Sequence, residues 1–190
     1  MSGFPNSWFE PQVEDWTSLW ECLHDAYVLS IHHDALEGTA VVELKLGYPA
    51  ANESGVTSEK ASIQFRGTTH ILLSLWRGWP GPRTEYCQDM TSEQWNEELK
   101  AWTKKGCVQT VKIDDFNEAL SKDEAYILEA RGSFGSSRCL IEFEGCFNEG
   151  ESFSALIAGD SVSVELDGFE SSIEDLMSKG TKAWDAFHSK

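Results

Sequence analysis

Alternation of apolar and polar side chains predicts β-strands through the first half of the chain. Residues 27–33 are rich in strand-forming side chains, and the two-residue period of a strand places Tyr27, Leu29 and Ile31 on one face. Residues 40–46 alternate after a turn-like stretch, which predicts a hairpin, and residues 61–66 alternate again. Residues 71–76 are apolar at almost every position, so we expect that strand to be covered on both faces.

The second half of the chain carries further strand patterns. Strands are predicted at residues 108–113, 126–131 and 139–144. The alternation in the last of these turns Glu142 and Glu144 toward water. Residues 153–157 and 162–166 flank a short turn that contains glycine, which predicts a final hairpin.

Apolar residues at steps of three and four predict three amphipathic helices. They span residues 13–23 near the N-terminus, 91–106 in the middle and 173–187 near the C-terminus. A further helical turn is predicted at residues 114–120. Each of the three longer helices has one apolar face, which we expect to pack on a sheet.

The order of these elements indicates an α+β fold. Consecutive strands are too closely joined for parallel crossovers, so we expect a mostly antiparallel sheet of about eight strands. The N-terminal, central and C-terminal helices are expected to pack on it. A chain of 190 residues has room for one substantial core, and residues 1–190 are therefore expected to form a single domain.

The chain is strongly acidic, and its charges are segregated. The net charge is −17, which disfavours binding to nucleic acid or to an anionic membrane. Eight carboxylates and no Lys or Arg precede Lys45, and ten carboxylates and no basic residue lie between Arg138 and Lys179. An excess of acidic side chains on the surface often does no more than keep a protein soluble. If the two blocks meet in the fold, they predict one negative face suited to a basic protein.

The N-terminus does not indicate export, and the cysteines do not indicate a metal site. The first eight residues lack the basic start and apolar run of a signal peptide, and no segment is apolar enough to span a bilayer, so we expect a cytoplasmic protein. The five cysteines contain no Cys-x-x-Cys pair, which favours buried free thiols over a zinc site. No cofactor is expected.

Histidines and carboxylates crowd together only near the start of the first predicted strand. His24, Asp25 and His32 are the candidates there for a metal or acid/base site, which would suit a hydrolase. His32 and His33 point to opposite faces of a strand, and no recognised ligand spacing is present. Structural roles for these residues are the favoured interpretation, and no catalytic residue is assigned.

Aromatic side chains offer a different kind of site. Trp76 and Trp79 flank a Pro- and Gly-rich segment with Arg77 between them, and could form an exposed binding platform or simply pack. The candidate binding residues are therefore this trio together with four acidic residues: Glu142, Glu144, Glu165 and Asp167. A cavity for a small ligand, between the sheet and the C-terminal helix, is a further alternative.

The segment Leu23-His24-Asp25-Ala26-Tyr27-Val28-Leu29-Ser30-Ile31, followed by a turn and Val41-Val42-Glu43-Leu44-Lys45-Leu46, resembles the opening of several small acidic bacterial families. Some of these are grouped with the immunity proteins of polymorphic toxin systems. The resemblance covers about the first quarter of the chain. It implies a non-catalytic α+β protein that binds and blocks a toxin, and an acidic surface would suit a basic target such as a nuclease.

Overall fold

A computed structural model describes residues 16–47, 60–76, 104–136, 138–148 and 150–189, with residues 94, 97, 100 and 101. Among these residues, no helix has the length and apolar character needed to cross a membrane. The fold is α+β, and every strand pairing in its sheet is antiparallel.

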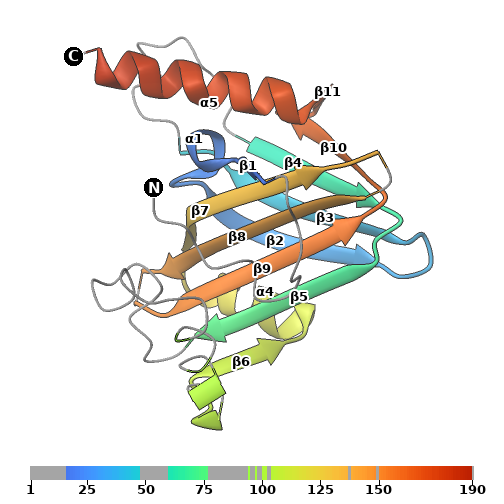
Figure 1. Cartoon of the computed structure of the whole chain (residues 1–190), viewed down its shortest axis with the longest axis vertical. Helices are drawn as coiled ribbons and strands as arrows, with labels where there is room; N and C mark the ends of the chain where they lie inside the picture. Colours follow the sequence, from blue (N-terminus) through green and yellow to red (C-terminus); the bar gives the residue numbers. More distant parts are fainter. Residues whose placement is uncertain are drawn as a thin grey trace.

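The described part of the chain forms more strands than the expected eight or so. The strands are β1 (Thr17–Ser18), β2 (Tyr27–Asp34), β3 (Thr39–Lys45), β4 (Lys60–Arg66), β5 (His70–Trp76), β6 (Val108–Val111), β7 (Ala125–Phe134), β8 (Cys139–Phe147), β9 (Ser152–Gly159), β10 (Ser161–Leu166) and β11 (Phe169–Ser171). The helices with named bounds are α1 (Trp20–Leu23), α4 (Ile113–Lys122) and α5 (Ile173–His188). Eleven strands join in one sheet (Figure 1).

The sheet closes on itself. β4 continues into β5, and β9 continues into β10. These two long strands pair with each other and bend together, and we call the pair the bent ribbon: Arg66 faces Ser161 on one side of the bend, and His70 faces Ala158 on the other. From this bent ribbon the pairing runs one way through β3 to β2 and the other way through β8 to β7. β2 and β7 then meet at Tyr27 and Tyr126, which completes a barrel. The expected hairpin of 153–157 with 162–166 is therefore wrong.

Glycines make the bend in this ribbon possible. Gly67 has φ +62°, and a Cβ there would overlap the Asp160 carboxylate. A Cβ at Gly159 would lie 2.8 Å from the carbonyl oxygen of Arg66. Because both sides of the corner lack a Cβ, the two strands can turn together without losing contact, and Asp160 N donates to Arg66 O at 2.8 Å.

β-Bulges curve the strands where β2 meets β7. Leu29 is the extra residue in β2, and Leu128 is the extra residue in β7. The bulge in β2 changes which face the following residues occupy. Leu29 is 47% exposed while Val28 and Ile31 are buried, so Leu29 does not share the buried face that strict alternation predicts.

Aromatic rings fill the barrel around Phe153. The rings of Phe116, Phe143 and Phe147 meet Phe153 edge to face, with centroids 5.7, 6.3 and 5.5 Å away. Gly145 leaves room for this packing, because a Cβ there would lie 2.6 Å from the Phe153 ring. Phe116 comes from α4, so this helix contributes directly to the core.

α4 also completes the hydrogen bonding of β2. β2 pairs with β7 at only two positions, and its edge is open beyond them. The Asn117 side chain accepts from Ile31 N at 2.9 Å and donates to Ile31 O at 2.7 Å. A helix side chain thus takes the place of a neighbouring strand. This segment was expected to form only a helical turn, and it forms a ten-residue helix.

Helix packing differs from the expectation in other ways. The N-terminal helix is the single turn α1, and residues 13–15 of its expected range lie outside the described residues. Residues 94, 97, 100, 101 and 104 are helical, but the buried stripe expected in this central helix lies outside the described residues. The C-terminal helix is confirmed as α5. It packs mainly on α1 and touches β10 (Figure 1).

α5 approaches α1 most closely at Gly180. A Cβ at this position would lie 2.5 Å from Glu21 O and 2.6 Å from Cys22 Cα. We predict that Gly180→Ala lowers the free energy of unfolding by about 1–3 kcal/mol through overpacking. Helix propensity alone would raise it by about 1 kcal/mol. Chemical denaturation distinguishes these opposite effects on stability. Ser178→Ala, at an exposed site on the same helix, is the control. Stabilisation by Gly180→Ala would contradict the described contact.

Candidate functional site

Carboxylates from distant parts of the sequence line up on the outer face of the barrel. Ser62 on β4 faces Glu43 on β3 from one side and Glu165 on β10 from the other, and Glu165 faces Glu170 on β11. Residues opposite each other in a sheet share a face, so these side chains form one row. We call Glu43, Glu165 and Glu170 the acidic row.

The acidic row joins the two acidic blocks of the sequence. Glu43 belongs to the N-terminal block, and the other two carboxylates belong to the C-terminal block. Glu165 and Glu170 are exposed, and the Ser62 hydroxyl donates to Glu43 Oε1 at 3.0 Å. The next row on the same face contains Lys45 opposite Lys60. The face therefore presents carboxylates beside one basic pair.

Like charges face each other in this row, and no described residue places a cation between them. Glu165 and Glu170 are direct partners in the antiparallel ladder, and this arrangement is unfavourable in a sheet. The only side chain between Glu43 and Glu165 in the row is the neutral Ser62. A bound cationic group would relieve this repulsion. Such a feature is typical of a surface whose partner carries the opposite charge.

Asp167, another predicted binding residue, has a local structural role. It lies in the turn between β10 and β11 with φ +50°, followed by Gly168 with φ +84°. Its Oδ1 accepts from Lys60 N at 3.0 Å, which ties the turn to the start of β4. Asp167 therefore fixes the end of the strand that carries Glu165.

Glu142 and Glu144 do not face water as the alternation predicts. They are 3% and 8% exposed, because β8 is covered on both faces. Glu142 Oε2 accepts from Arg131 Nε at 2.6 Å, and the Arg131 guanidinium lies 4.3 Å from the centre of the Trp16 ring. Burial raises the pKa of the Glu142 carboxyl, and Arg131 opposes this shift. These two glutamates are interior groups.

The aromatic platform is not formed by Trp76. Its side chain is 3% exposed, and it belongs to the end of β5, where both faces are covered, as predicted for that strand. Arg77 and Trp79 lie outside the described residues. Trp76 is therefore a packing residue.

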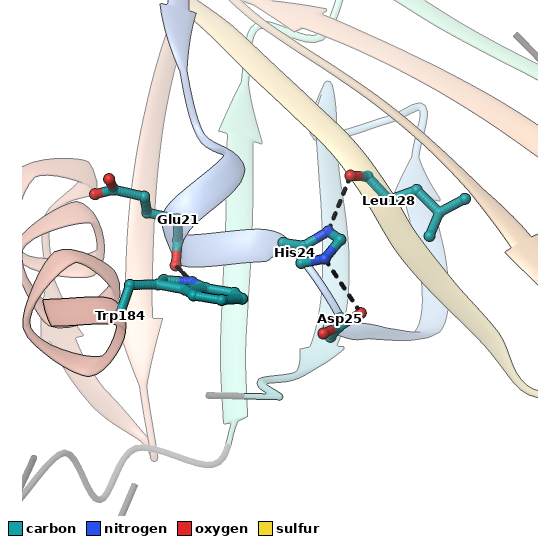
Figure 2. A network of polar contacts seen from close by, with 5 residues as sticks. All are labelled: Glu21, His24, Asp25, Leu128 and Trp184. Carbon is teal, nitrogen blue, oxygen red and sulfur yellow. Dashed lines mark hydrogen bonds and ion pairs between the residues drawn. The ribbon is translucent and has the colours of Figure 1, made fainter. Parts of the chain in front are cut away.

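His24 holds α1, α5 and β7 together (Figure 2). Its ring stacks on Trp20 at 4.5 Å and lies 5.8 Å from Trp184, which itself donates to Glu21 O at 2.9 Å. His24 Nδ1 donates to the carbonyl of Leu128, the extra residue of the β7 bulge, at 3.0 Å. His24 is thus held by ring contacts with Trp20 and Trp184 and by the hydrogen bond at Nδ1.

The predicted constellation of His24, Asp25 and His32 is only partly assembled. His24 Nε2 lies 3.5 Å from Asp25 Oδ1. His32 lies five residues along β2 from Tyr27, roughly 16 Å at ~3.3 Å per residue. In the part of the chain that the structure describes, no group of three or more His, Cys, Asp or Glu side chains could hold a metal ion.

Comparison with known proteins gives no family. No protein-family model, no curated protein and no solved structure matches the chain.

The repulsion in the acidic row should be measurable. We predict that Glu170→Gln raises the free energy of unfolding by about 0.2–1 kcal/mol at low salt, because it removes one of two facing charges. The gain should shrink in 1 M NaCl. Glu174→Gln is the control, since it removes a favourable charge from the first turn of α5 and should destabilise. Destabilisation by both variants in urea denaturation would contradict the described pairing.

The buried ion pair gives a second prediction. Arg131→Met should lower the free energy of unfolding by about 3–5 kcal/mol at pH 7, because it leaves the Glu142 carboxylate buried without its partner. With its folded-state pKa raised, Glu142 binds a proton more readily in the folded protein, so the variant should gain stability as pH falls from 7 to 5. The double variant Arg131→Met/Glu142→Leu should recover most of the loss. Equal instability of the single and double variants would contradict this account.

Proposed function

We propose that this protein is a non-catalytic binding module that uses the acidic row to dock a basic protein. The observation that carries the proposal is the meeting of Glu43 with Glu165 and Glu170 on one exposed face. Segments more than 100 residues apart in the sequence supply these carboxylates. A net charge of −17 adds a long-range attraction that accelerates the encounter with a basic partner.

The form of the face supports a protein partner. β3, β4 and β10 form adjacent strands of one sheet, and their outward residues are mostly polar and partly or fully exposed. The backbone is held by ladder hydrogen bonds on both sides of β3 and β4, so the row is preorganised. A rigid row of carboxylates suits lysine and arginine side chains presented by another folded protein.

The resemblance of residues 23–46 to small acidic bacterial families, some of them grouped with immunity proteins, makes the proposal more specific. An inhibitor of this kind works by covering its target, and it needs no catalytic group. A basic toxin, such as a nuclease, is the partner that the acidic row would fit. The alternative of a hydrolase has less support, since His24 is engaged in packing and His32 lies far along β2.

The proposal predicts where a cationic probe binds. Deca-lysine should shift the backbone NMR resonances of residues 43, 62, 165 and 170 most strongly. The triple variant Glu43→Gln/Glu165→Gln/Glu170→Gln should bind it roughly tenfold more weakly, because three facing charges are lost. The control Glu37→Gln/Glu124→Gln/Asp185→Asn removes the same charge from exposed sites elsewhere.

The control should retain nearly the full affinity. An equal loss in both variants, or shifts spread evenly over all acidic residues, would show that net charge alone attracts the probe. That result would remove the acidic row as a docking site.

A further inference from the structure

A cleft of about 680 Å³ lies beside the corner of the bent ribbon. Its walls come from the end of β2, the link from β4 to β5, and the beginning of α4, which packs against β2 and β5. Figure 1 shows α4 next to β5 at this part of the barrel. No residue of the acidic row lines the cleft.

The polar lining of this cleft contrasts with the rest of the protein. Three of the five histidines in the chain line it, namely His32, His33 and His70, together with Lys112. Asp114 is the one carboxylate in the lining. In a chain with 32 acidic and 15 basic residues, the cleft thus gathers hydrogen-bond donors and a cation where carboxylates would be expected.

The start of α4 adds backbone donors to the cleft. Thr68 also lines it, but the Thr68 Oγ1 atom is buried beneath the surface and is not presented to a ligand. α4 begins in the cleft after Lys112, which provides no side-chain cap for the first turn. The backbone N–H groups of that turn have no partner within the helix. These groups favour a negatively charged ligand, whereas the carboxylates of Asp114 and Asp115 in the same turn oppose one.

Most of the remaining lining is apolar, beside Thr69 and Asn117. Ile31 and Leu73 are fully buried beneath the surface of the cleft, whereas Ile71, Val111 and Ile113 are partly exposed in it. A ligand with a hydrophobic body could pack on these side chains while its charged end meets the donors. The combination of an apolar wall and a few convergent polar groups is typical of a small-molecule site.

We propose that the corner cleft binds a small organic anion, a phosphomonoester or a carboxylate. Its charged group is held by Lys112, His70, one of the two β2 histidines and the first turn of α4, and its body packs on the apolar wall. Asp114 opposes the anion and limits the affinity. This site is separate from the acidic row, and it adds ligand binding to the proposed protein-binding function.

Four aromatic probes of similar size test the charge preference: phenyl phosphate, benzoate, benzyl alcohol and benzylamine. Titrations followed by backbone NMR should show binding of phenyl phosphate or benzoate, with shifts at residues 31–33, 68–71 and 112–117. Tighter binding of phenyl phosphate would indicate a phosphomonoester site, and tighter binding of benzoate would indicate a carboxylate site. Benzyl alcohol and benzylamine should bind at least tenfold more weakly.

Variants at both ends of α4 test the role of the lining. Lys112→Gln should weaken anion binding about threefold or more, and Asp114→Asn should tighten it by a similar factor. Lys122→Gln, the same charge change at the far end of the helix, should leave it unchanged. All three positions are exposed, and circular dichroism confirms their folding.

Preferred binding of benzylamine, or no binding of either anion at 10 mM, would overturn the proposal. So would equal effects of Lys112→Gln and Lys122→Gln, because net charge would then explain them. The triple variant of the acidic row should bind the anion as the unchanged protein does. This result separates the cleft from the proposed protein-docking function.

Discussion

The bend in the β4–β5 and β9–β10 ribbon determines the rest of the architecture. At Gly67 and Gly159 the two paired strands turn together, so one ribbon serves both walls of the barrel. Without the turn, the strands on either side could not curve back to meet at β2 and β7. The interior that results is filled by aromatic side chains around Phe153, and α4 closes the side where β2 lacks a strand partner.

Both candidate sites follow from this closure. β10 turns away from β9 and lies against β4, which brings Glu165 to the same face as Glu43. At the corner itself the link between β4 and β5 meets the end of β2 and the start of α4, and the cleft forms there. The proposed docking face and the proposed ligand cleft thus arise from one change of strand direction. They are separate in composition, since one gathers carboxylates and the other gathers histidines.

Local pattern predicted most strands close to their true positions, because alternation reflects which faces of each strand are covered. It could not predict pairing. Residues 153–157 and 162–166 look like a hairpin in sequence, but they do not pair with each other, and each has one partner strand about 80 to 100 residues earlier in the chain. Glu142 and Glu144 alternate with apolar residues, yet β8 is covered on both faces. The acidic blocks suggested that carboxylates from both parts of the chain could share a face, and Glu43 and Glu165 do so, but the register that places both opposite Ser62 depends on long-range contacts.

Cross-strand contacts measured by NMR test the closed, bent sheet most directly. Nuclear Overhauser effects between backbone protons of Ser62 and Glu165, and between those of Tyr27 and Tyr126, are expected from the pairing. Contacts along β5 and β9 should accompany them, with none between β9 and β10. A ladder of contacts between residues 153–157 and 162–166 would indicate a simple hairpin. It would contradict the bend, the barrel and the acidic row together.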